Sequence, residues 1–527
     1  MKQPAFLLRV IRIFRPLLIM AMIGLIFYLG VHSERTGFVS EVLDPGFKRI
    51  VMPVLKALRG GPKAAELRIF IAANDLDSIA AVRERALQAG VLDEGKDTWY
   101  KVKLLWRADT LTARLRLKGG LTDHLRTTKW SYRVQLAPGD TVLGMQTFSI
   151  QHPNTRNFIN EWIFHGTLAR HGLPHLRYDF IEVSINDREL GLHAIEQHFD
   201  STMLAEQGLF GPVIKFDDEA RIGVLKQMNE RGYPSDAPMQ GDWQSAPVEA
   251  FHLKEVLDDR MLTLRYQHAL RLLEEFRQGS RSTSEVFDAT AMARLFAVCD
   301  LLGAQHAQDW RNLRFVPDSV GARLVPIGFD ANAGEPLEAI RAARREHGPL
   351  RFDHTRVDDF QARLFSDSVF YKAYIAWLDT VSAPGWLEAL MDDLAMGMVP
   401  RQRIIMNEFP NAALDRAVFG HCRAVIRQTI APDDALLAYL DVTSDGSTVH
   451  VASTHVLPLE INAIVLGIDT LRQMADTRLL PRDRAAAISY TSIRLPQISS
   501  STKCTVLYHV MGMEMILSAK ARLRGTR

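Results

Sequence analysis

The chain has 527 residues, of which 47% are hydrophobic and 24% are charged, a composition that excludes long disordered or low-complexity proteins. Its 63 Lys and Arg nearly balance its 61 Asp and Glu, so the net charge of +2 gives no sign of the basic face that nucleic-acid binding needs. The three cysteines are too widely spaced for a disulfide framework or a CxxC metal site. We therefore expect about two to four domains and no nucleic-acid partner.

An uncharged apolar segment near the N-terminus does not fit a soluble protein. It runs from Pro16 to Val31, is extended by Ile13 and Phe14, and follows several basic residues. About 20 apolar residues span a bilayer, and a basic flank tends to stay on the cytoplasmic side. Because no small-x-small cleavage site follows, we expect an uncleaved anchor rather than a cleaved signal peptide. The sequence thus predicts a single-pass protein of the cytoplasmic membrane, with its N-terminus inside and its main domain outside.

Changes in composition, together with Gly and Pro residues that favour turns, divide the chain into five expected parts. They are a cytoplasmic basic tail (1–12), a transmembrane anchor (13–32), a linker (33–64), a folded domain (65–400), and a helical connection with a β-rich C-terminal module (401–527).

Apolar periodicity in the folded domain predicts a mixture of strands and helices. Strands are expected at 66–72, 99–106, 111–117, 130–136, 179–185, 191–196, 213–216, 309–315 and 322–329. Helices are expected at 76–89, 157–171, 253–278, 289–303 and within 356–400. A segment rich in Pro, Gly, Ser and Asp at 234–247 is expected to be a surface loop, and short strands follow from about residue 433.

Two clusters of oxygen-bearing side chains lie about twenty residues apart, next to expected strands. One contains Asp309 and Asn312, and the other contains Asp330 and Asn332. Phosphoryl transfer needs one aspartate that positions the accepting hydroxyl, together with an Asn and a second Asp that hold magnesium. Asp309, Asn312 and Asp330 offer these groups in that order. Asp and Asn that merely cap turns give the same pattern, and a turn residue is the better interpretation of Asn332.

Two strand lysines and one glutamate form a second pattern. Lys129 precedes an expected strand, Lys215 lies near the end of another, and Glu196 ends a third. A strand lysine that meets nucleotide phosphates and is oriented by a glutamate is the arrangement found in kinases. The alternative for each lysine is a solvated strand end. His198 and His306 are expected to be structural, because no HxxxH or HExxH spacing accompanies them.

Several separated blocks resemble, in the same order, the CotH kinase-like proteins, a family named for a bacterial spore coat protein. The similarity extends over roughly residues 65–400. It is densest in FSIQHPNTR (148–156), YDFIEVSINDRELGLHAIE (178–196), GPVIKFDD (211–218) and the segment 306–330. The resemblance implies an α+β, atypical protein-kinase-like fold with a mixed or antiparallel sheet and a helical lobe. To this the sequence adds the N-terminal transmembrane helix and the small β-rich C-terminal module.

The resemblance also implies an activity, the transfer of the γ-phosphate of ATP to Ser or Thr hydroxyls of a protein with Mg²⁺ or Mn²⁺. Asp309 corresponds to the catalytic aspartate of the family. Asp330 corresponds to the aspartate that holds the metal, and Asn312 to a second metal ligand. Only two residues separate Asp309 from Asn312, against four in ordinary kinases, so the metal role of Asn312 is an analogy.

Lys129 and Lys215 both fall in lysine-bearing blocks of the family, and either could meet the phosphates, with Glu196 as the expected partner. Two residues depart from the family pattern. Asn332 stands where many relatives have a second Asp, and Gln197 stands where some relatives have Glu.

The expected function is therefore a membrane-anchored atypical kinase that acts on an envelope or surface protein. One alternative is a weak or inactive module of the same fold that acts in envelope assembly or adhesion. The scarcity of ATP outside the cytoplasm favours this alternative. Another is a phosphotransferase whose acceptor is a surface glycan.

Overall fold

The computed structural model describes residues 62–93, 98–233, 243–318, 322–344, 350–473, 477–483 and 485–524. Across these ranges no helix combines the length and the apolar character that a membrane span requires. This finding contradicts the predicted single-pass membrane protein, and we abandon that prediction. The segment 13–32, on which it rested, lies outside the described residues, as do the expected tail and nearly all of the expected linker.

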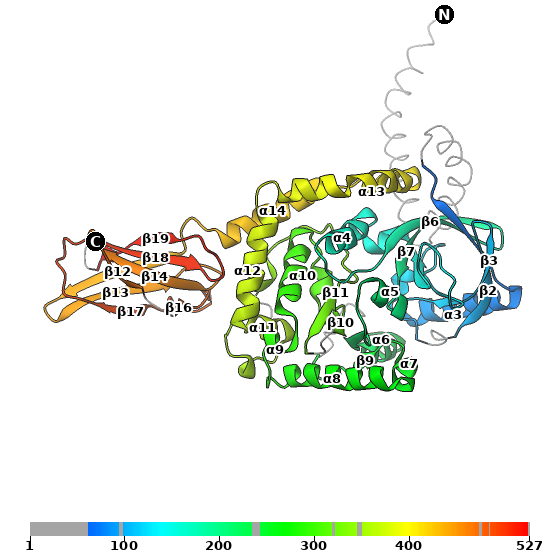
Figure 1. Ribbon diagram of the computed structural model, residues 1–527, viewed down its shortest axis with the longest axis horizontal. Helices are drawn as coiled ribbons and strands as arrows, with labels where there is room; N and C mark the ends of the chain where they lie inside the picture. Colours follow the sequence, from blue (N-terminus) through cyan, green and yellow to red (C-terminus); the bar gives the residue numbers. More distant parts are fainter. Residues whose placement is uncertain are drawn as a thin grey trace, which may run out of the picture.

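Seven strands close into a barrel at the N-terminal end of the described chain (Figure 1). In barrel order they are β1 (Ala65–Phe70), β2 (Tyr100–Trp106), β3 (Asp109–Leu117), β4 (Tyr132–Leu136), β5 (Thr147–Gln151), β7 (Arg188–Gln197) and β6 (Tyr178–Ile185). Neighbouring strands are antiparallel except β1 and β6, whose parallel pairing closes the barrel. Helix α3 (Ala73–Ala89) packs Ile79 and Val82 against the barrel core. It ends at Gly90, whose φ of 75° suits glycine.

The closed barrel corrects the predicted fold. The structure is α+β with mixed sheets, but the N-terminal sheet closes into a barrel that was not predicted, and no helix of the described ranges can serve as the predicted transmembrane helix. Alternation predicted strands β2 and β3, and both are confirmed. Strand β5, with the sequence TFSIQ, was missed although polar and apolar residues alternate along it, and the structure buries all five of them.

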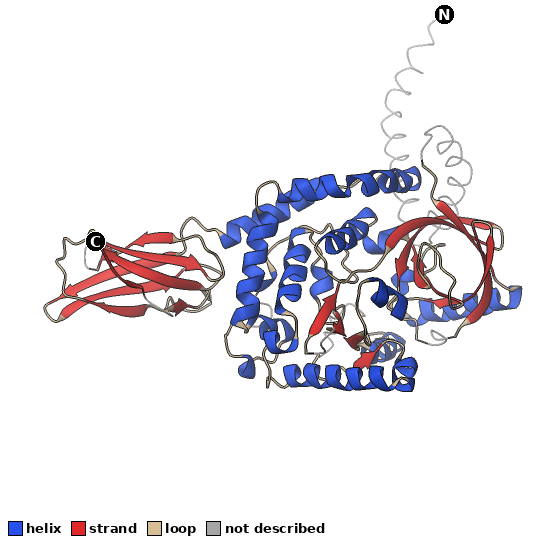
Figure 2. Ribbon diagram, viewed as in Figure 1, coloured by secondary structure: helices blue, strands red, loops and turns tan. Residues whose placement is uncertain are grey.

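The middle of the described chain is mostly helical, and its helices flank a small four-stranded sheet (Figure 2). The sheet has the order β11 (Leu324–Ile327), β10 (Arg314–Pro317), β8 (Ile214–Phe216) and β9 (Val248–Ala250). The longer helices are α4 (Ile159–Arg170), α6 (Glu219–Glu230), α8 (Arg260–Arg277), α10 (Ala289–Leu301), α12 (Ser368–Ser382), α13 (Trp386–Glu408) and α14 (Arg416–Ile430). The shorter ones are α5 (Ser201–Glu206), α7 (Leu253–Asp258), α9 (Thr283–Val286) and α11 (Phe360–Phe365). Side chains of α10, α12 and α14 share the largest hydrophobic core.

Two predicted elements of this region differ from the structure. The helix expected at 253–278 is divided into α7 and α8 at Asp259, whose side chain caps the N-terminus of α8. The strand expected at 309–315 begins only at Arg314, because a 3-10 turn (Gln305–Gln308) and a further turn precede it. Asp309 therefore lies in a loop ahead of β10 and not on a strand.

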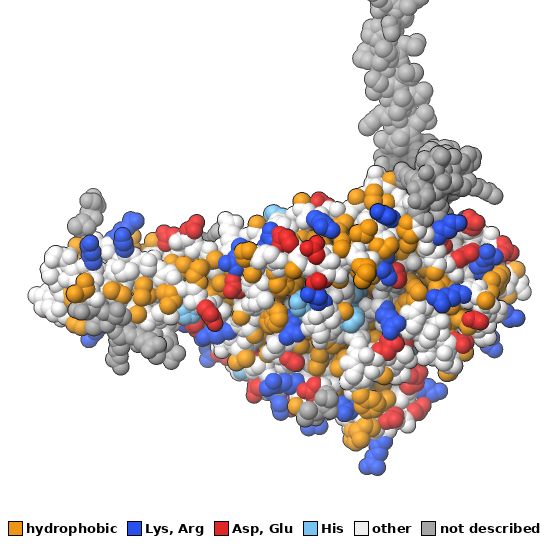
Figure 3. All heavy atoms as spheres, turned by 45° about the horizontal axis from the view of Figure 1, so that its top comes forward, with side chains coloured by type: hydrophobic (Ala, Val, Ile, Leu, Met, Phe, Trp, Pro, Cys, Tyr) orange, Lys and Arg blue, Asp and Glu red, His pale blue; other side chains and the backbone are white. Residues whose placement is uncertain are grey.

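The C-terminal part is a sandwich of two sheets that follows α14 (Figure 1). One sheet has the order β17 (Thr491–Leu495), β13 (Gly446–Ser453), β12 (Leu436–Thr443) and β20 (Arg522–Leu523). The other has the order β15 (Asp469–Gln473), β14 (Leu459–Leu466), β18 (Cys504–Val510) and β19 (Leu517–Lys520), with β16 (Arg478–Leu479) beside β14. On the face shown in Figure 3, basic and acidic side chains are interspersed along the whole molecule.

Candidate functional site

A buried ion pair lies where the barrel meets the helical part. Lys118 directly follows β3, and its Nζ is 2.7 Å from Oε2 of Glu196 near the end of β7. Lys118 Nζ also donates to Oε1 of Gln151, at the end of β5, over 2.8 Å. The strand order β3, β4, β5, β7 brings these residues together, since each lies at or next to the end of a barrel strand. Lys118 is 8% exposed and Glu196 is 1% exposed, so water screens the pair only weakly.

Arg156 connects this pair to the helical part. Its Nε is 3.8 Å from Oε1 of Glu196, and its Nη1 is 3.0 Å from Oδ1 of Asp330. Asp330 lies three residues after β11, in a loop where its φ is 53°. Two of the residues singled out in the sequence, Glu196 and Asp330, are thus joined through one arginine.

Burial disfavours the charged form of several cations at this site, while Asp330 and Glu196 raise the pKa of Arg156 above its usual value. Burial lowers the pKa of Lys118 to about 8, although Glu196 opposes the shift. Burial also lowers the pKa of Arg133 to about 9 and that of Arg314 to about 10. For Glu196, burial alone would raise the pKa, but Lys118 and Arg156 outweigh it and bring the pKa to about 2. An anionic ligand at this point would reduce the free energy lost by burying the cations.

Asp309 is held by a neighbour in its own loop. Nε and Nη2 of Arg311 each lie 2.8 Å from one of its carboxylate oxygens, and the Arg311 N–H donates to the first of them over 3.0 Å. Burial would raise the pKa of Asp309, but its hydrogen bond and ion pair with Arg311 lower it instead. Asp309 is therefore ionised at neutral pH. Asn312 donates from Nδ2 to the carbonyl oxygen of His306 over 2.9 Å.

His306 lies between the two aspartates. Its Nε2 is 3.6 Å from Oδ1 of Asp330, and its carbonyl oxygen accepts the N–H of Asp309 over 3.2 Å. Its side chain is 52% exposed, so the ring is open to solvent on one side.

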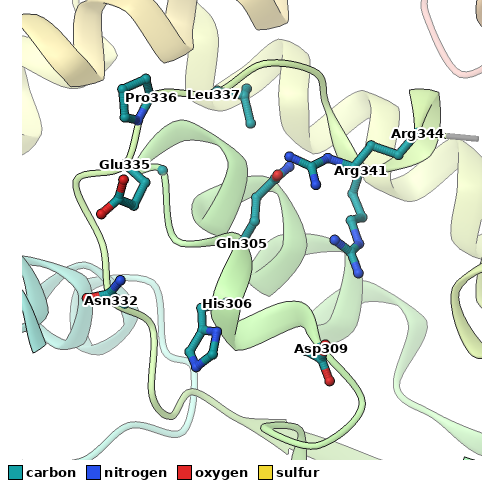
Figure 4. A pocket seen from close by; sticks show the side chains of 10 residues that line it. Gln305, His306, Asp309, Asn332, Glu335, Pro336, Leu337, Arg341 and Arg344 are labelled. Carbon is teal, nitrogen blue, oxygen red and sulfur yellow. The ribbon is translucent and has the colours of Figure 1, made fainter. Parts of the chain in front are cut away.

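A pocket of about 280 Å³ opens beside Asp309 and His306. Figure 4 shows Arg341 and Arg344 on one side of it and Asn332 on the other, with His306 and Asp309 in the lower part of the view. The remaining lining residues are Gly303, Gln305, Glu335, Pro336 and Leu337. The pocket is large enough for a side chain that brings a hydroxyl group to Asp309.

The two lysines singled out in the sequence have other partners. Lys129 Nζ donates to the carbonyl oxygen of Leu192 over 2.8 Å and is 3.0 Å from Oε1 of Glu408, at the end of α13. Lys215 pairs with the carboxylate of Asp217. The lysine that meets Glu196 is Lys118, which sequence reasoning missed. The available signal was its position, directly after an alternating strand and before two glycines.

The two residues that depart from the family pattern have structural partners. The N–H of Asn332 donates to Oε2 of Glu161 over 3.0 Å, and its φ of 45° is that of a turn residue. Gln197 accepts the N–H of Arg177 at Oε1. These contacts account for the backbone of Asn332 and for the side-chain oxygen of Gln197 without a ligand.

Within the ranges that the structure describes, no group of three or more His, Cys, Asp or Glu side chains is placed so that it could hold a metal ion. Oδ1 of Asp330 and Oε1 of Glu196 are buried and, among the described residues, accept no hydrogen bond of good geometry, although each forms an ion pair with Arg156, at 3.0 Å and 3.8 Å. A carboxylate oxygen of this kind fits a divalent cation that takes most of its other ligands from phosphates and water, as Mg²⁺ does. All three cysteines lie in the described ranges and are free and buried.

Comparison with models of known protein families and with curated proteins gives no match to this chain.

Proposed function

We propose that the chain is a phosphotransferase that moves the γ-phosphate of ATP to a Ser or Thr hydroxyl of a protein. The observation that supports the proposal is the series Lys118, Glu196, Arg156 and Asp330, in which each side chain meets the next; the first three are buried and Asp330 is partly buried. A lysine oriented by a glutamate and placed near a metal-holding aspartate is what protein kinases use to bind nucleotide phosphates. The resemblance to CotH kinase-like proteins supports the same assignment.

Lys118 is the residue that we assign to the phosphates. Its Nζ is fixed by Glu196 and Gln151, so its position is set before any ligand arrives. Arg156 adds a second cation beside Asp330. Phosphate oxygens would offset the effect of burial, which lowers the pKa of Lys118, Arg133 and Arg314.

Asp330 is the residue that we assign to Mg²⁺ or Mn²⁺, with Asn312 as a further oxygen ligand. Oδ1 of Asp330, which pairs with Arg156 but accepts no hydrogen bond of good geometry among the described residues, is the atom that we assign to the cation. A divalent cation bound there would neutralise the charge that develops on the phosphoryl oxygens.

Asp309 is the residue that we assign to the acceptor. An ionised carboxylate next to the pocket orients the incoming hydroxyl and takes its proton as the bond from oxygen to the γ-phosphorus forms. The bond from the γ-phosphorus to the bridging oxygen breaks in the same displacement, and ADP leaves. Arg311 keeps Asp309 ionised until then.

A second candidate function follows from the same loop. Both carboxylate oxygens of Asp309 are already engaged by Arg311, and the described residues hold no cluster of three metal-binding side chains. These observations favour a module that binds an anionic ligand without transferring phosphate, and that acts in assembly or adhesion.

Incorporation of labelled γ-phosphate by the full chain separates the two candidates. Purified protein is incubated with labelled ATP, Mg²⁺ or Mn²⁺, and dephosphorylated casein, and autophosphorylation is measured in parallel. We expect Asp309→Asn and Asp330→Asn each to reduce incorporation by at least about 100-fold. Asp367→Asn is the matched control, because Asp367 is a buried carboxylate that caps α12 and binds the N–H of Ser284. Equal incorporation in all four proteins would contradict the proposal.

A further inference from the structure

The loop that carries Asp330 has an unusual backbone. Asp330 has a φ of 53° and Asn332 a φ of 45°, so two residues with side chains adopt the left-handed conformation within three positions. Such residues persist only where the surrounding structure holds them, and they concentrate at functional sites. The contacts that hold this loop therefore decide where the Asp330 carboxylate points.

A buried carboxylate from another element holds the loop. Glu161, in the first turn of α4, is 0% exposed. Its Oε1 accepts the N–H of Ala331 and its Oε2 accepts the N–H of Asn332, each over 3.0 Å. The two oxygens of one carboxylate thus bind the two peptide groups that directly follow Asp330.

His165 and Arg156 lie near the carboxylate of Glu161. Nδ1 of His165, one turn further along α4, accepts the N–H of Leu176 over 3.2 Å, so the ring proton lies on Nε2. That Nε2 lies 3.6 Å from Oε1 of Glu161. Arg156, which contacts Asp330, also interacts electrostatically with Glu161.

The residues at and just before the start of α4 also contact the end of the loop that carries Asp330. Nδ2 of Asn157 donates to the carbonyl oxygen of Ala333 over 2.7 Å. Gly334 approaches this segment so closely that a Cβ there would lie 2.6 Å from Nδ2 of Asn160. Residues 157–161 therefore contact the loop along residues 331–334.

We propose that Glu161 is a positioning residue that fixes the carboxylate of Asp330 in one orientation, toward Arg156 and His306. The kinetic part of this inference rests on the proposed phosphotransferase. The geometric part does not, because the two hydrogen bonds define the loop whatever Asp330 binds. Because Glu161 already fixes this loop, the Asp330 carboxylate has its orientation before a ligand binds.

Amide hydrogen exchange and steady-state kinetics on the full chain test the assignment. The variant is Glu161→Gln, in which the amide group keeps one acceptor and sets an N–H against the second peptide N–H. We expect the exchange of the Ala331 and Asn332 amides to accelerate at least about tenfold. We expect kcat to fall about 10- to 100-fold, with the KM for ATP changed by less than about twofold.

Asp367→Asn is again the control. Asp367 is a buried carboxylate that also accepts backbone N–H groups, those of Ser284 and Val369, but it does so in another part of the chain. We expect the substitution to leave the exchange of the Ala331 and Asn332 amides and kcat unchanged. If Glu161→Gln behaves like Asp367→Asn in both measurements, the assignment is overturned. If the wild-type chain transfers no phosphate while Glu161→Gln still accelerates exchange, the proposed function fails and the positioning role stands.

Asn157→Ala is the milder second variant, for the case that Glu161→Gln does not fold. It removes the hydrogen bond to Ala333 and leaves Glu161 intact. We expect it to accelerate exchange in residues 331–334 and to lower kcat in the same direction. Unchanged exchange in that segment would contradict the role of residues 157–161.

Discussion

Lys118 and Glu196 form an ion pair of 2.7 Å in which each partner comes from a different strand end of the barrel. Arg156 extends the pair to Asp330, which belongs to the helical part of the chain. The charges of the site are therefore connected across the boundary between the two parts.

The charge of Lys118 predicts how nucleotide binding depends on pH. Burial lowers its pKa from 10.5 to about 8, so the side chain loses its charge as the pH rises through about 8. We expect the affinity for Mg·ATP to fall over the same range. Lys118→Arg should keep its charge to a higher pH, because the ordinary pKa of a guanidinium lies about two units above that of an ammonium group, although burial lowers the pKa of Arg133 and Arg314 in this site. We therefore expect its affinity to fall less than that of the wild type over this range. Titration calorimetry between about pH 7 and pH 10 measures both. A parallel decline in the two proteins would contradict the assignment of Lys118 to the phosphates.

The ion pair between Arg311 and Asp309 predicts how kcat/KM depends on pH at the acid end of the pH range. It lowers the pKa of Asp309 against the effect of burial, so its removal should let that pKa rise. In Arg311→Gln we expect the acid limb of kcat/KM to move to higher pH, because Asp309 must be ionised to accept a proton. Arg311→Lys retains the positive charge and should move the limb less. An acid limb at the same pH in all three proteins would show that Asp309 is not the group that titrates.

The close packing of Gly303 in the wall of the pocket predicts that its replacement by alanine destabilises the protein more than a similar replacement elsewhere. A Cβ at Gly303 would lie 1.8 Å from the carbonyl oxygen of Glu335, and its φ is +58°. We expect Gly303→Ala to lower the free energy of unfolding by more than about 2 kcal/mol. Gly139→Ala is the control, because its φ of +89° carries the same backbone strain while no described atom lies within 4 Å of the added Cβ. It should cost only about 1 kcal/mol. Urea denaturation measures both, and equal losses would contradict the close approach of Gly303 to Glu335.

Sequence reasoning found part of the site and missed the rest for a physical reason. Asp309, Asp330 and Glu196 were singled out because each belongs to a local pattern of polar residues next to apolar runs. The local signal of Lys118, its position after an alternating strand and before two glycines, indicates no partner, and its contact with Glu196 depends on the pairing of β3 with β4, β4 with β5 and β5 with β7. The closed barrel was missed on the same grounds, because its closure is a parallel contact between β1 and β6.

Lys129 and Lys215, the two lysines singled out from the sequence, show that a family pattern does not identify the carboxylate that a lysine contacts. Lys129 is oriented by Glu408, which lies far along the chain at the end of α13. Lys215 is oriented by Asp217, only two residues away. A lysine near a strand identifies a candidate for phosphate binding, but only the tertiary contacts show which carboxylate holds it.

Calorimetric titration of the full chain with Mg·ATP at pH 7 tests the central claim most directly, with Lys118→Met and Lys215→Met measured beside the wild type. We predict saturable binding by the wild type, at least about tenfold weaker binding by Lys118→Met, and a change of less than about twofold in Lys215→Met. A wild-type chain that does not bind Mg·ATP, or a Lys118→Met variant that binds as the wild type does, would contradict the account.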